Sequence, residues 1–278
     1  MILRLSNNSM ELIRQCPRAS YYGVVLRKRA ALRRSALDFG SAIHDGLAAL
    51  YSGASVEEAV KVMPAFESDD YRNYDTAKMV LQLYKPKQEW LPPDQVETKF
   101  ACHLTTINDI DVVYRGRFDL VKNGWIIDHK TTSMLGETFN LGMEVSPQLW
   151  GYVWAYERLF GVPAKGFIVN TLCIRPSIAN AMVVGDELIA NGSSKPFEVG
   201  QLQFEYSQQY VDDWLYSTIE FVSRFITNLM RNEYTLNRQA CVSRYGLCPY
   251  WIVCQAKSER ERAMLINSNS FVEADETD

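Results

Sequence analysis

Two aspartates and a lysine, Asp119, Asp128 and Lys130, are the residues whose types and spacing most directly indicate chemistry. The dipeptide Asn123-Gly124 lies between the aspartates, in a stretch rich in Val, Leu, Ile, Phe and Trp. Asn-Gly is typical of a two-residue β-hairpin, because both central positions of that turn need a positive φ. Lys130 follows Asp128 by two positions, so both side chains project from the same face of a strand. The pattern predicts two carboxylates and an ammonium gathered on one hairpin.

The expected register of this hairpin brings the two carboxylates together. If Lys122 pairs with Trp125, counting outward sets Asp119 directly opposite Asp128. The Cβ atoms of such a pair lie roughly 4.5–5.5 Å apart, and like charges there are destabilising. In a buried hairpin the charges need partners, and a divalent cation between the acids is the leading hypothesis. The alternative is an exposed sheet face on which Asp128 forms a weak ion pair with Lys130.

The periodicity of apolar residues predicts the elements that position these groups. We expect helices over 9–26, 38–51, 56–63, 70–90, 147–160 and 210–231, with Pro92-Pro93 ending the fourth. We expect strands over 96–105, 110–121, 125–130, 164–174 and 197–206. This order predicts an α/β fold with a mixed sheet.

Bulk properties narrow the class of protein. The chain has 278 residues and a formal net charge of −4, which suits one large domain or two small ones and excludes a generally basic nucleic-acid coat protein. We see no segment that would span a membrane and no secretory pattern, so we expect a cytoplasmic protein without a disulfide framework.

Two runs of charge stand out from this balance. The basic run is either a solvated helix face or a strip that contacts phosphates, and it consists of Arg27, Lys28, Arg29, Arg33 and Arg34. The acidic tail, expected to be a solvated end, consists of Glu273, Asp275, Glu276 and Asp278.

Around the hairpin the chain resembles the PD-(D/E)XK nucleases. The residues that carry this resemblance are Gly116-Arg117-Phe118-Asp119, Asp128-His129-Lys130, and the pair Gln148 and Tyr152. The most similar branch is that of the RecB nuclease domain, AddB and the iron–sulfur exonucleases of CRISPR adaptation. That branch also carries a helix motif, which here reads Phe39-Gly40-Ser41-Ala42-Ile43-His44. Each motif is short, but their joint occurrence in this order over residues 6–254 is specific.

The resemblance implies a restriction-endonuclease-like core, with a central mixed β-sheet flanked by helices, and a metal site. Asp119, Asp128 and His44 would ligate Mg²⁺ or Mn²⁺, with the backbone carbonyl of His129 as a further ligand. Hard oxygen ligands suit both cations, and an imidazole favours Mn²⁺. Lys130 would orient or deprotonate the attacking water, or hold the charge that builds in the transition state.

Other side chains near this site have competing interpretations. Gln148 and Tyr152 share a helix face, and in the family such a pair helps to hold the DNA strand and the lysine. The alternative is that Tyr152 packs the helix on the sheet. His44 could equally be structural, but the small residues around it favour a close approach to the acids. Strand alternation turns the His129 side chain away from the acids, and Glu97 matches an acidic position sometimes found beside such sites.

Four cysteines suggest a second metal centre. By resemblance, a [4Fe–4S] cluster would be held by Cys16, Cys241, Cys248 and Cys254. The loop between the second and third of these is longer than in many such nucleases. Structural Zn²⁺ and unliganded thiols are the alternatives. Cys102 and Cys173 fall in predicted strands, where we expect core residues.

Together these features predict an N-terminal helical region (1–93) carrying Cys16 and His44, a nuclease core (94–235), a cysteine-rich segment docked on the N-terminus (236–257) and a flexible tail (258–278), all in one structural domain. The leading hypothesis is a metal-dependent DNA exonuclease or end-processing enzyme that acts on DNA with a single-stranded end. By analogy with the family, it would serve recombination or repair in a prokaryotic or phage-infected cell, with partner proteins of those pathways. The alternatives are a catalytically silent module that binds DNA ends or a partner, and an endonuclease.

Overall fold

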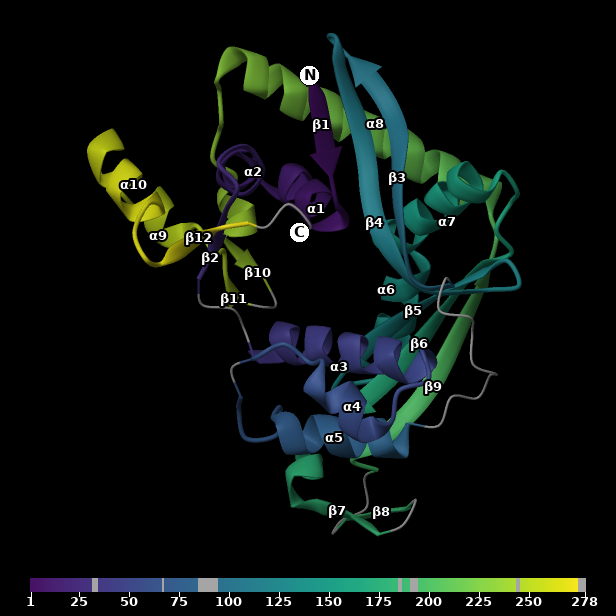
Figure 1. Cartoon of the computed structure of the whole chain (residues 1–278). Coiled ribbons are helices and arrows are strands. Elements are labelled where there is room, and N and C mark those ends of the chain that lie inside the picture. The colour runs from purple at the N-terminus through teal and green to yellow at the C-terminus, as the bar shows by residue number, and fades with distance from the viewer. Residues whose placement is uncertain are drawn as a thin grey trace. The chain divides into compact units, whose positions relative to one another are not determined.

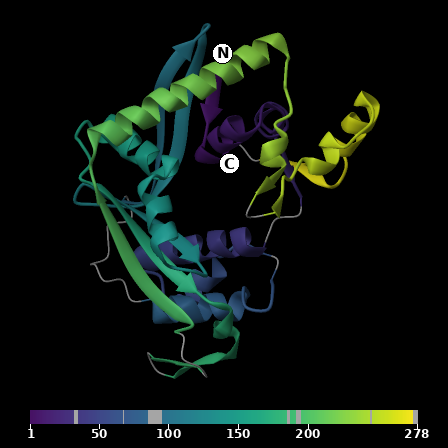
Figure 2. The same cartoon turned by 180° about the vertical axis from the view of Figure 1, so that it is seen from behind.

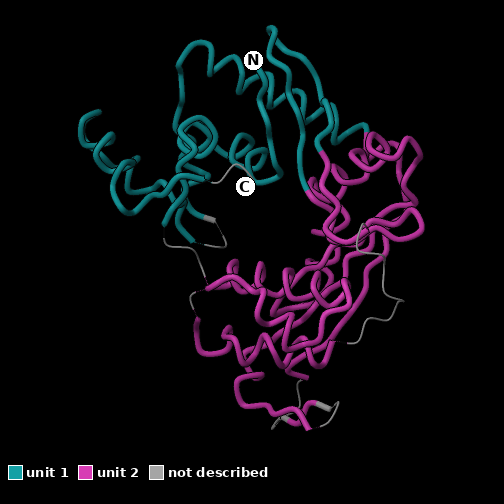
Figure 3. Tube along the Cα trace, viewed as in Figure 1, with its two compact units in different colours: residues 1–33, 101–116, 212–278 teal, residues 34–100, 117–211 magenta. Residues whose placement is uncertain are grey.

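The structure is a computed structural model that describes residues 1–31, 35–66, 68–84, 95–184, 187–190, 195–243 and 246–274 (Figure 1). Some predicted features lie outside the described residues: Arg33 and Arg34 of the basic run, the 85–90 end of the fourth helix, Pro92-Pro93, and Asp275, Glu276 and Asp278 of the acidic tail. The chain forms two compact units (Figure 3). The first unit comprises Met1–Arg33, Ala101–Gly116 and Asp212–Asp278, and the second comprises Arg34–Phe100 and Arg117–Val211. The expected region 1–93 therefore contributes to both units.

The second unit is built on a mixed sheet. Strand β5 (Trp125–Thr132) pairs with the end of β4 (Ile110–Lys122) in antiparallel and with β6 (Gly166–Ile174) in parallel orientation. Strand β9 (Phe197–Glu205) runs antiparallel to β6, and the view from behind shows the two side by side (Figure 2). Every residue of β6 is buried, as expected of a central strand covered on both faces. The α/β fold with a central mixed sheet and flanking helices is confirmed.

The hairpin between β4 and β5 has the predicted turn. Lys122 pairs with Trp125, and Asn123 and Gly124 have φ values of 51° and 85°. The paired ladder ends at Leu120 and Ile127. Asp119 and Asp128 are therefore the next residues beyond the ladder on their strands, where side chains can replace main-chain pairing.

Helices cover both faces of this sheet. One face packs on α3 (Ser35–Tyr51), α4 (Val56–Lys61) and α5 (Tyr74–Leu83), which share a buried core with Ile127 and Ile168. Phe167 precedes Ile168 and so projects from the opposite face, where its ring lies 5.0 Å from that of Trp150 on α7 (Pro147–Phe160). Helix α7 has the predicted bounds, while α3 begins three residues earlier than expected, at Ser35.

The predicted helix over 9–26 is interrupted in the first unit. It consists of α1 (Asn7–Gln15), α2 (Pro17–Ser20) and a π-helical turn (Tyr21–Val25). Cys16 separates α1 from α2 with extended angles, φ −158° and ψ 120°, because a residue before proline avoids the helical region. Strand β1 (Ile2–Leu5), which was not predicted, lies parallel to the first part of β4.

The C-terminal segment packs on these N-terminal helices within the first unit. Cys16 and Tyr22 share a core with Val253, Ile266 and Phe271, in agreement with the expected docking. The prediction of a flexible tail from residue 258 is wrong as far as residue 273. Helix α10 (Glu259–Ile266) precedes β12 (Phe271–Glu273), and β12 pairs with β2 (Lys28–Ala30). Burial of the Phe271 ring offsets the entropy cost of ordering this strand. Lys28 and Arg29 of the basic run thus lie on a strand, so the interpretation of these two residues as a helix face is wrong.

The remaining elements complete the description. They are β3 (Val96–Ile107), α6 (Glu137–Glu144), a 3₁₀ turn (Pro176–Asn180), β7 (Ala181–Val184), β8 (Glu187–Ala190), α8 (Gln208–Arg231), a second 3₁₀ turn (Arg238–Cys241), β10 (Val242–Ser243), β11 (Gly246–Leu247) and α9 (Trp251–Cys254). Among the described residues, no helix combines the length and apolar character needed to cross a membrane.

Candidate active site

Asp119 is a buried acid held from two sides in the second unit. Its Oδ2 accepts a 2.7 Å hydrogen bond from the backbone N–H of His129 and lies 3.1 Å from Nδ1 of His44 on α3. Helix α3 comes so close to the sheet that a Cβ on Gly40 would stand 3.1 Å from Oγ1 of Thr131. The small residues of α3 therefore let the His44 imidazole reach the acid, as predicted.

Electrostatics couple Asp119 to His44. Burial would raise the pKa of the Asp119 carboxyl, but His44 and the main chain of His129 outweigh burial and hold this pKa well below its usual range. Burial would likewise lower the pKa of His44, but Asp119 outweighs it and raises the pKa. Each partner favours the charged form of the other. Because an imidazolium has no lone pair to give, ligation of a cation by His44 requires loss of a proton.

Asp128 and Lys130 form a second buried pair. Lys130 Nζ lies 2.6 Å from Asp128 Oδ2, which confirms that the two side chains share a face of β5. Burial raises the pKa of Asp128, with Lys130 acting in the opposite direction and Asp119 adding to the rise. Burial would lower the pKa of Lys130, but Asp128 outweighs it, so the pKa rises and the ammonium keeps its charge.

Gln148 and Tyr152 extend this pair into a hydrogen-bonded row. Lys130 Nζ donates to Gln148 Oε1 at 3.1 Å, and Gln148 Nε2 donates to the Tyr152 hydroxyl at 3.0 Å. The Tyr152 ring also packs edge-on against Phe118, with centroids 5.4 Å apart at 90°. The Tyr152 hydroxyl thus contacts the glutamine that accepts from the lysine, and the ring packs α7 on the sheet.

The His129 side chain lies in the core beneath the site. It is 2% exposed, its ring stacks on Tyr51 at 5.8 Å, and its Nδ1 lies 2.9 Å from Asn170 Nδ2. Burial lowers the pKa of His129 to about 4. The imidazole of His129 therefore lies in the core, while the backbone N–H of the same residue donates to Asp119.

Three charged residues lie near Asp119: Glu97 and Arg117, which the sequence analysis named, and Asp45, which it did not. Glu97 forms an ion pair with Arg117, and burial raises the pKa of Glu97 to about 7, against the effect of Arg117 and with a contribution from Asp119. Burial also raises the pKa of Asp45, which interacts with Arg117, His44 and Asp119. The only sequence signal for Asp45 was its position next to a predicted site residue. Glu97 has a φ of 57°, a conformation unusual for a non-glycine residue in a strand.

The donor atoms suit a hard divalent cation. Two buried carboxylates, one imidazole and the carbonyl of His129 are ligand types that Mg²⁺ and Mn²⁺ accept. Their side chains are engaged with one another, however: in the part of the chain that the structure describes, no three His, Cys, Asp or Glu side chains are arranged to hold a metal ion. Ligation would therefore replace the contacts of Asp119 with His44 and of Asp128 with Lys130.

The four cysteines of the predicted cluster all belong to the first unit. Asn237 links two of them: its N–H donates to Cys16 Sγ at 3.5 Å, and Cys241 Sγ donates to its carbonyl at 3.7 Å. Burial raises the pKa of Cys254 to about 11, against Arg18 and with contributions from the other three thiols. All six cysteines of the chain are free thiols. Among the residues that the structure describes, these four thiols are not arranged to hold a metal ion.

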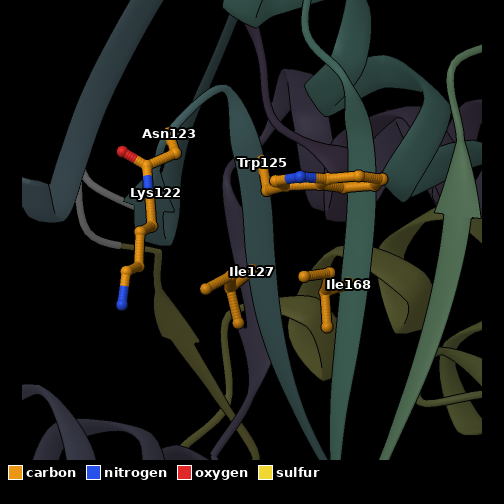
Figure 4. A pocket seen from close by; sticks show the side chains of 5 residues that line it. All are labelled: Lys122, Asn123, Trp125, Ile127 and Ile168. Carbon is orange, nitrogen blue, oxygen red and sulfur yellow. The ribbon is translucent and has the colours of Figure 1, made fainter. Parts of the chain in front are cut away.

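A cavity of about 240 Å³ lies at the turn end of the hairpin, away from the acids. It is lined by Lys122, Asn123, Trp125, Ile127 and Ile168 (Figure 4). Ile127 and Asp128 are consecutive residues of β5, so their side chains project from opposite faces of the sheet. The cavity is therefore not the place where the carboxylates would meet a substrate.

Comparison with known proteins identifies the family of this chain. A solved structure from Eubacterium rectale, of a protein described as a candidate exonuclease, matches with a TM-score of 0.49 and 9% identity, over 85% of this chain and 84% of that one. No curated protein matches the sequence. The family model "PD-(D/E)XK nuclease superfamily" matches residues 4–255, a range that contains both acids, Lys130, Gln148 and Tyr152. The chain belongs to the PD-(D/E)XK nuclease superfamily.

Proposed function

We propose that this protein is a metal-dependent deoxyribonuclease that hydrolyses phosphodiester bonds at DNA ends, as an exonuclease or end-processing enzyme. The observation that carries the proposal is the row Asp128–Lys130–Gln148–Tyr152, which stands beside the pair formed by Asp119 and His44. Membership of the nuclease superfamily supports phosphodiester cleavage. The preference for ends, and for a single-stranded end in particular, rests on the resemblance to the RecB-like branch.

Asp119, Asp128 and His44 are the side chains that would hold Mg²⁺ or Mn²⁺. Such a cation would offset charge on the phosphate and lower the pKa of an attacking water. The backbone N–H of His129 would keep Asp119 ionised and oriented, because it donates directly to one carboxylate oxygen. His44 would bind the cation as the neutral imidazole.

The charge of Lys130 favours two of its predicted roles over the third, deprotonation of the water. Its pKa is raised by Asp128, so it is an ammonium at neutral pH and has no lone pair with which to accept a proton. Lys130 would therefore orient the water and stabilise negative charge in the transition state, while Gln148 fixes the direction of its Nζ.

The test uses end-labelled linear DNAs of each polarity, single- and double-stranded, and a closed circle, each with Mg²⁺ and with Mn²⁺. Wild-type protein should shorten linear DNA, and Asp119→Asn and Lys130→Met should each reduce the rate at least about 100-fold. Lys122→Met, at the hairpin turn, is the matched control and should retain the wild-type rate. Full activity in both site variants would overturn the assignment.

Two other outcomes would select the alternatives. Cleavage of the closed circle at fixed positions would identify an endonuclease. Tight binding of DNA ends with no cleavage under either cation would identify a non-catalytic module with a nuclease fold.

A further inference from the structure

A row of buried polar side chains lies behind the candidate active site. The Tyr51 and Tyr84 hydroxyls are 2.7 Å apart, and Asn170 Nδ2 donates to the Tyr84 hydroxyl at 2.9 Å. The same Asn170 nitrogen lies 2.9 Å from Nδ1 of His129. The row thus joins α3, the end of α5, β6 and β5 in one hydrogen-bonded chain.

The burial of these polar side chains costs free energy of folding, because they lose their contacts with water. Asn170 is 1% exposed and His129 is 2% exposed, and of the four residues that flank them on this face Ile127, Ile168 and Leu172 are apolar and Thr131 is polar. A buried polar group loses its hydration and regains that free energy only through well-made hydrogen bonds. An apolar set of similar volume would pack this face without that cost.

The row ends at the main chain that holds Asp119. The His129 ring is fixed by the stack on Tyr51, at 5.8 Å and 25°, and by Asn170. The N–H of the same residue donates to Asp119 Oδ2 at 2.7 Å. A repacking that displaced the whole ring would shift the backbone of β5 at residue 129, between Asp128 and Lys130, and with it that N–H.

The row also fixes α3, which supplies His44. Tyr51 lies seven residues after His44, two turns along one face of the helix, and both rings contact His129. Helix α3 is therefore fastened to the hairpin at two points, to β4 by His44 with Asp119 and to β5 by Tyr51 with His129. The distance between the His44 imidazole and the two aspartates therefore depends on both of these contacts.

We propose that Asn170, Tyr84 and Tyr51 are positioning residues that, through His129, set the geometry in which Asp119 and His44 meet a divalent cation. This inference rests on the proposed function, because it concerns the cation of that site. The inference goes beyond the proposed function because it assigns a role to residues that would touch neither the cation nor DNA. Partners of this kind typically change metal affinity by about 10–100-fold.

The experiment measures Mn²⁺ binding by calorimetry, DNA cleavage as a function of Mn²⁺ concentration, and thermal unfolding on the same preparations. Asn170→Leu removes both hydrogen bonds at similar volume, and Tyr84→Phe removes one hydroxyl and keeps the ring. Thr218→Val, which changes another fully buried polar side chain in the first unit, is the control for loss of a buried polar group.

We expect Asn170→Leu to weaken Mn²⁺ binding about 10–100-fold and Tyr84→Phe to weaken it less. Excess Mn²⁺ should restore DNA cleavage in both variants. Thr218→Val should leave the Mn²⁺ affinity unchanged. Lower thermal stability with unchanged Mn²⁺ affinity in both variants would overturn the inference and leave a purely structural row. If Asn170→Leu does not fold, Tyr84→Phe decides by the same criterion. Wild-type protein that binds Mn²⁺ but cleaves no DNA would overturn the proposed function alone, since the affinities would still test the inference, and failure to bind Mn²⁺ would overturn both.

Discussion

The backbone N–H of His129 donates to Oδ2 of Asp119 at 2.7 Å, so one strand of the hairpin holds the acid of the other. The paired ladder stops at Leu120 and Ile127, and at the next position a side chain takes the main-chain donor. Asp119 is therefore satisfied without help from Asp128, which turns to Lys130 instead. The separate partners explain how two buried carboxylates coexist on adjacent strands.

The hydrogen bonds that join Lys130, Gln148 and Tyr152 predict that the Tyr152 hydroxyl contributes to activity separately from the ring. Gln148→Leu removes the acceptor that holds Lys130 Nζ, and a misplaced ammonium should lower the cleavage rate about 10- to 100-fold. Tyr152→Phe keeps the packing on Phe118 and should give a smaller loss with unchanged thermal stability. Single-turnover cleavage at saturating Mn²⁺ measures both effects.

The matched control for this prediction is Tyr156→Phe, which removes a hydroxyl one turn further along α7. It should leave the rate unchanged. Equal losses in Tyr152→Phe and Tyr156→Phe would show that the helix packing matters and the hydroxyl of Tyr152 does not.

The raised pKa of Glu97 predicts that the free energy of unfolding depends on pH in the absence of divalent cations. Burial raises its pKa from 4.5 to about 7, so between these values the folded protein holds a proton that the unfolded chain releases. The free energy of unfolding should therefore fall as pH rises from 4.5 to 7, by about 1–3 kcal/mol after allowance for partial exposure. Glu97→Gln should flatten this part of the profile.

Urea denaturation between pH 5 and pH 8 in EDTA measures the slope for each protein. Glu57→Gln, at an exposed position of α4, controls for the loss of one carboxylate. An identical profile in wild-type protein and Glu97→Gln would contradict the prediction.

The sequence predicted the parts of the site that depend on local signals. Asn123-Gly124 determined the turn and hence the register, and the spacing of Gln148 and Tyr152 placed both on one helix face. The sequence did not predict the Glu97–Arg117 ion pair, because the positive φ of Glu97 at the start of β3 has no sequence signature in a glutamate. Nor did it predict the partners of His129, since contacts with distant Tyr51 and Asn170 depend on how the helices pack.

The break in the helix at Cys16 has a sequence signal, the proline that follows it. Pro17 disfavours helical angles in the preceding residue, and Cys16 is extended. The pairing of β12 with β2 had no comparable signal, because three-residue strands distant in sequence carry no recognisable periodicity.

Metal analysis tests the cluster that the cysteine pattern predicts. The iron–sulfur prediction requires that protein purified without oxygen be brown and contain iron, and that Cys248→Ser lose both colour and iron. The thiols of Cys16 and Cys241 both contact the main chain of Asn237, so cluster formation would have to displace these contacts. Colourless protein with bound zinc, or with neither metal, would contradict the iron–sulfur prediction and leave the nuclease site unaffected.

The C-terminal strand predicts a stability effect far from the active site in sequence. Phe271 is 6% exposed, and its ring stacks on Tyr250 with centroids 5.8 Å apart. Phe271→Ala should lower the free energy of unfolding by about 3 kcal/mol, because a buried aromatic ring is lost and a cavity remains. Val272→Ala, at the exposed neighbouring position of β12, should change it by less than about 1 kcal/mol. Equal stability of both variants in urea denaturation would mean that residues 271–273 contribute little to folding, as a frayed tail would.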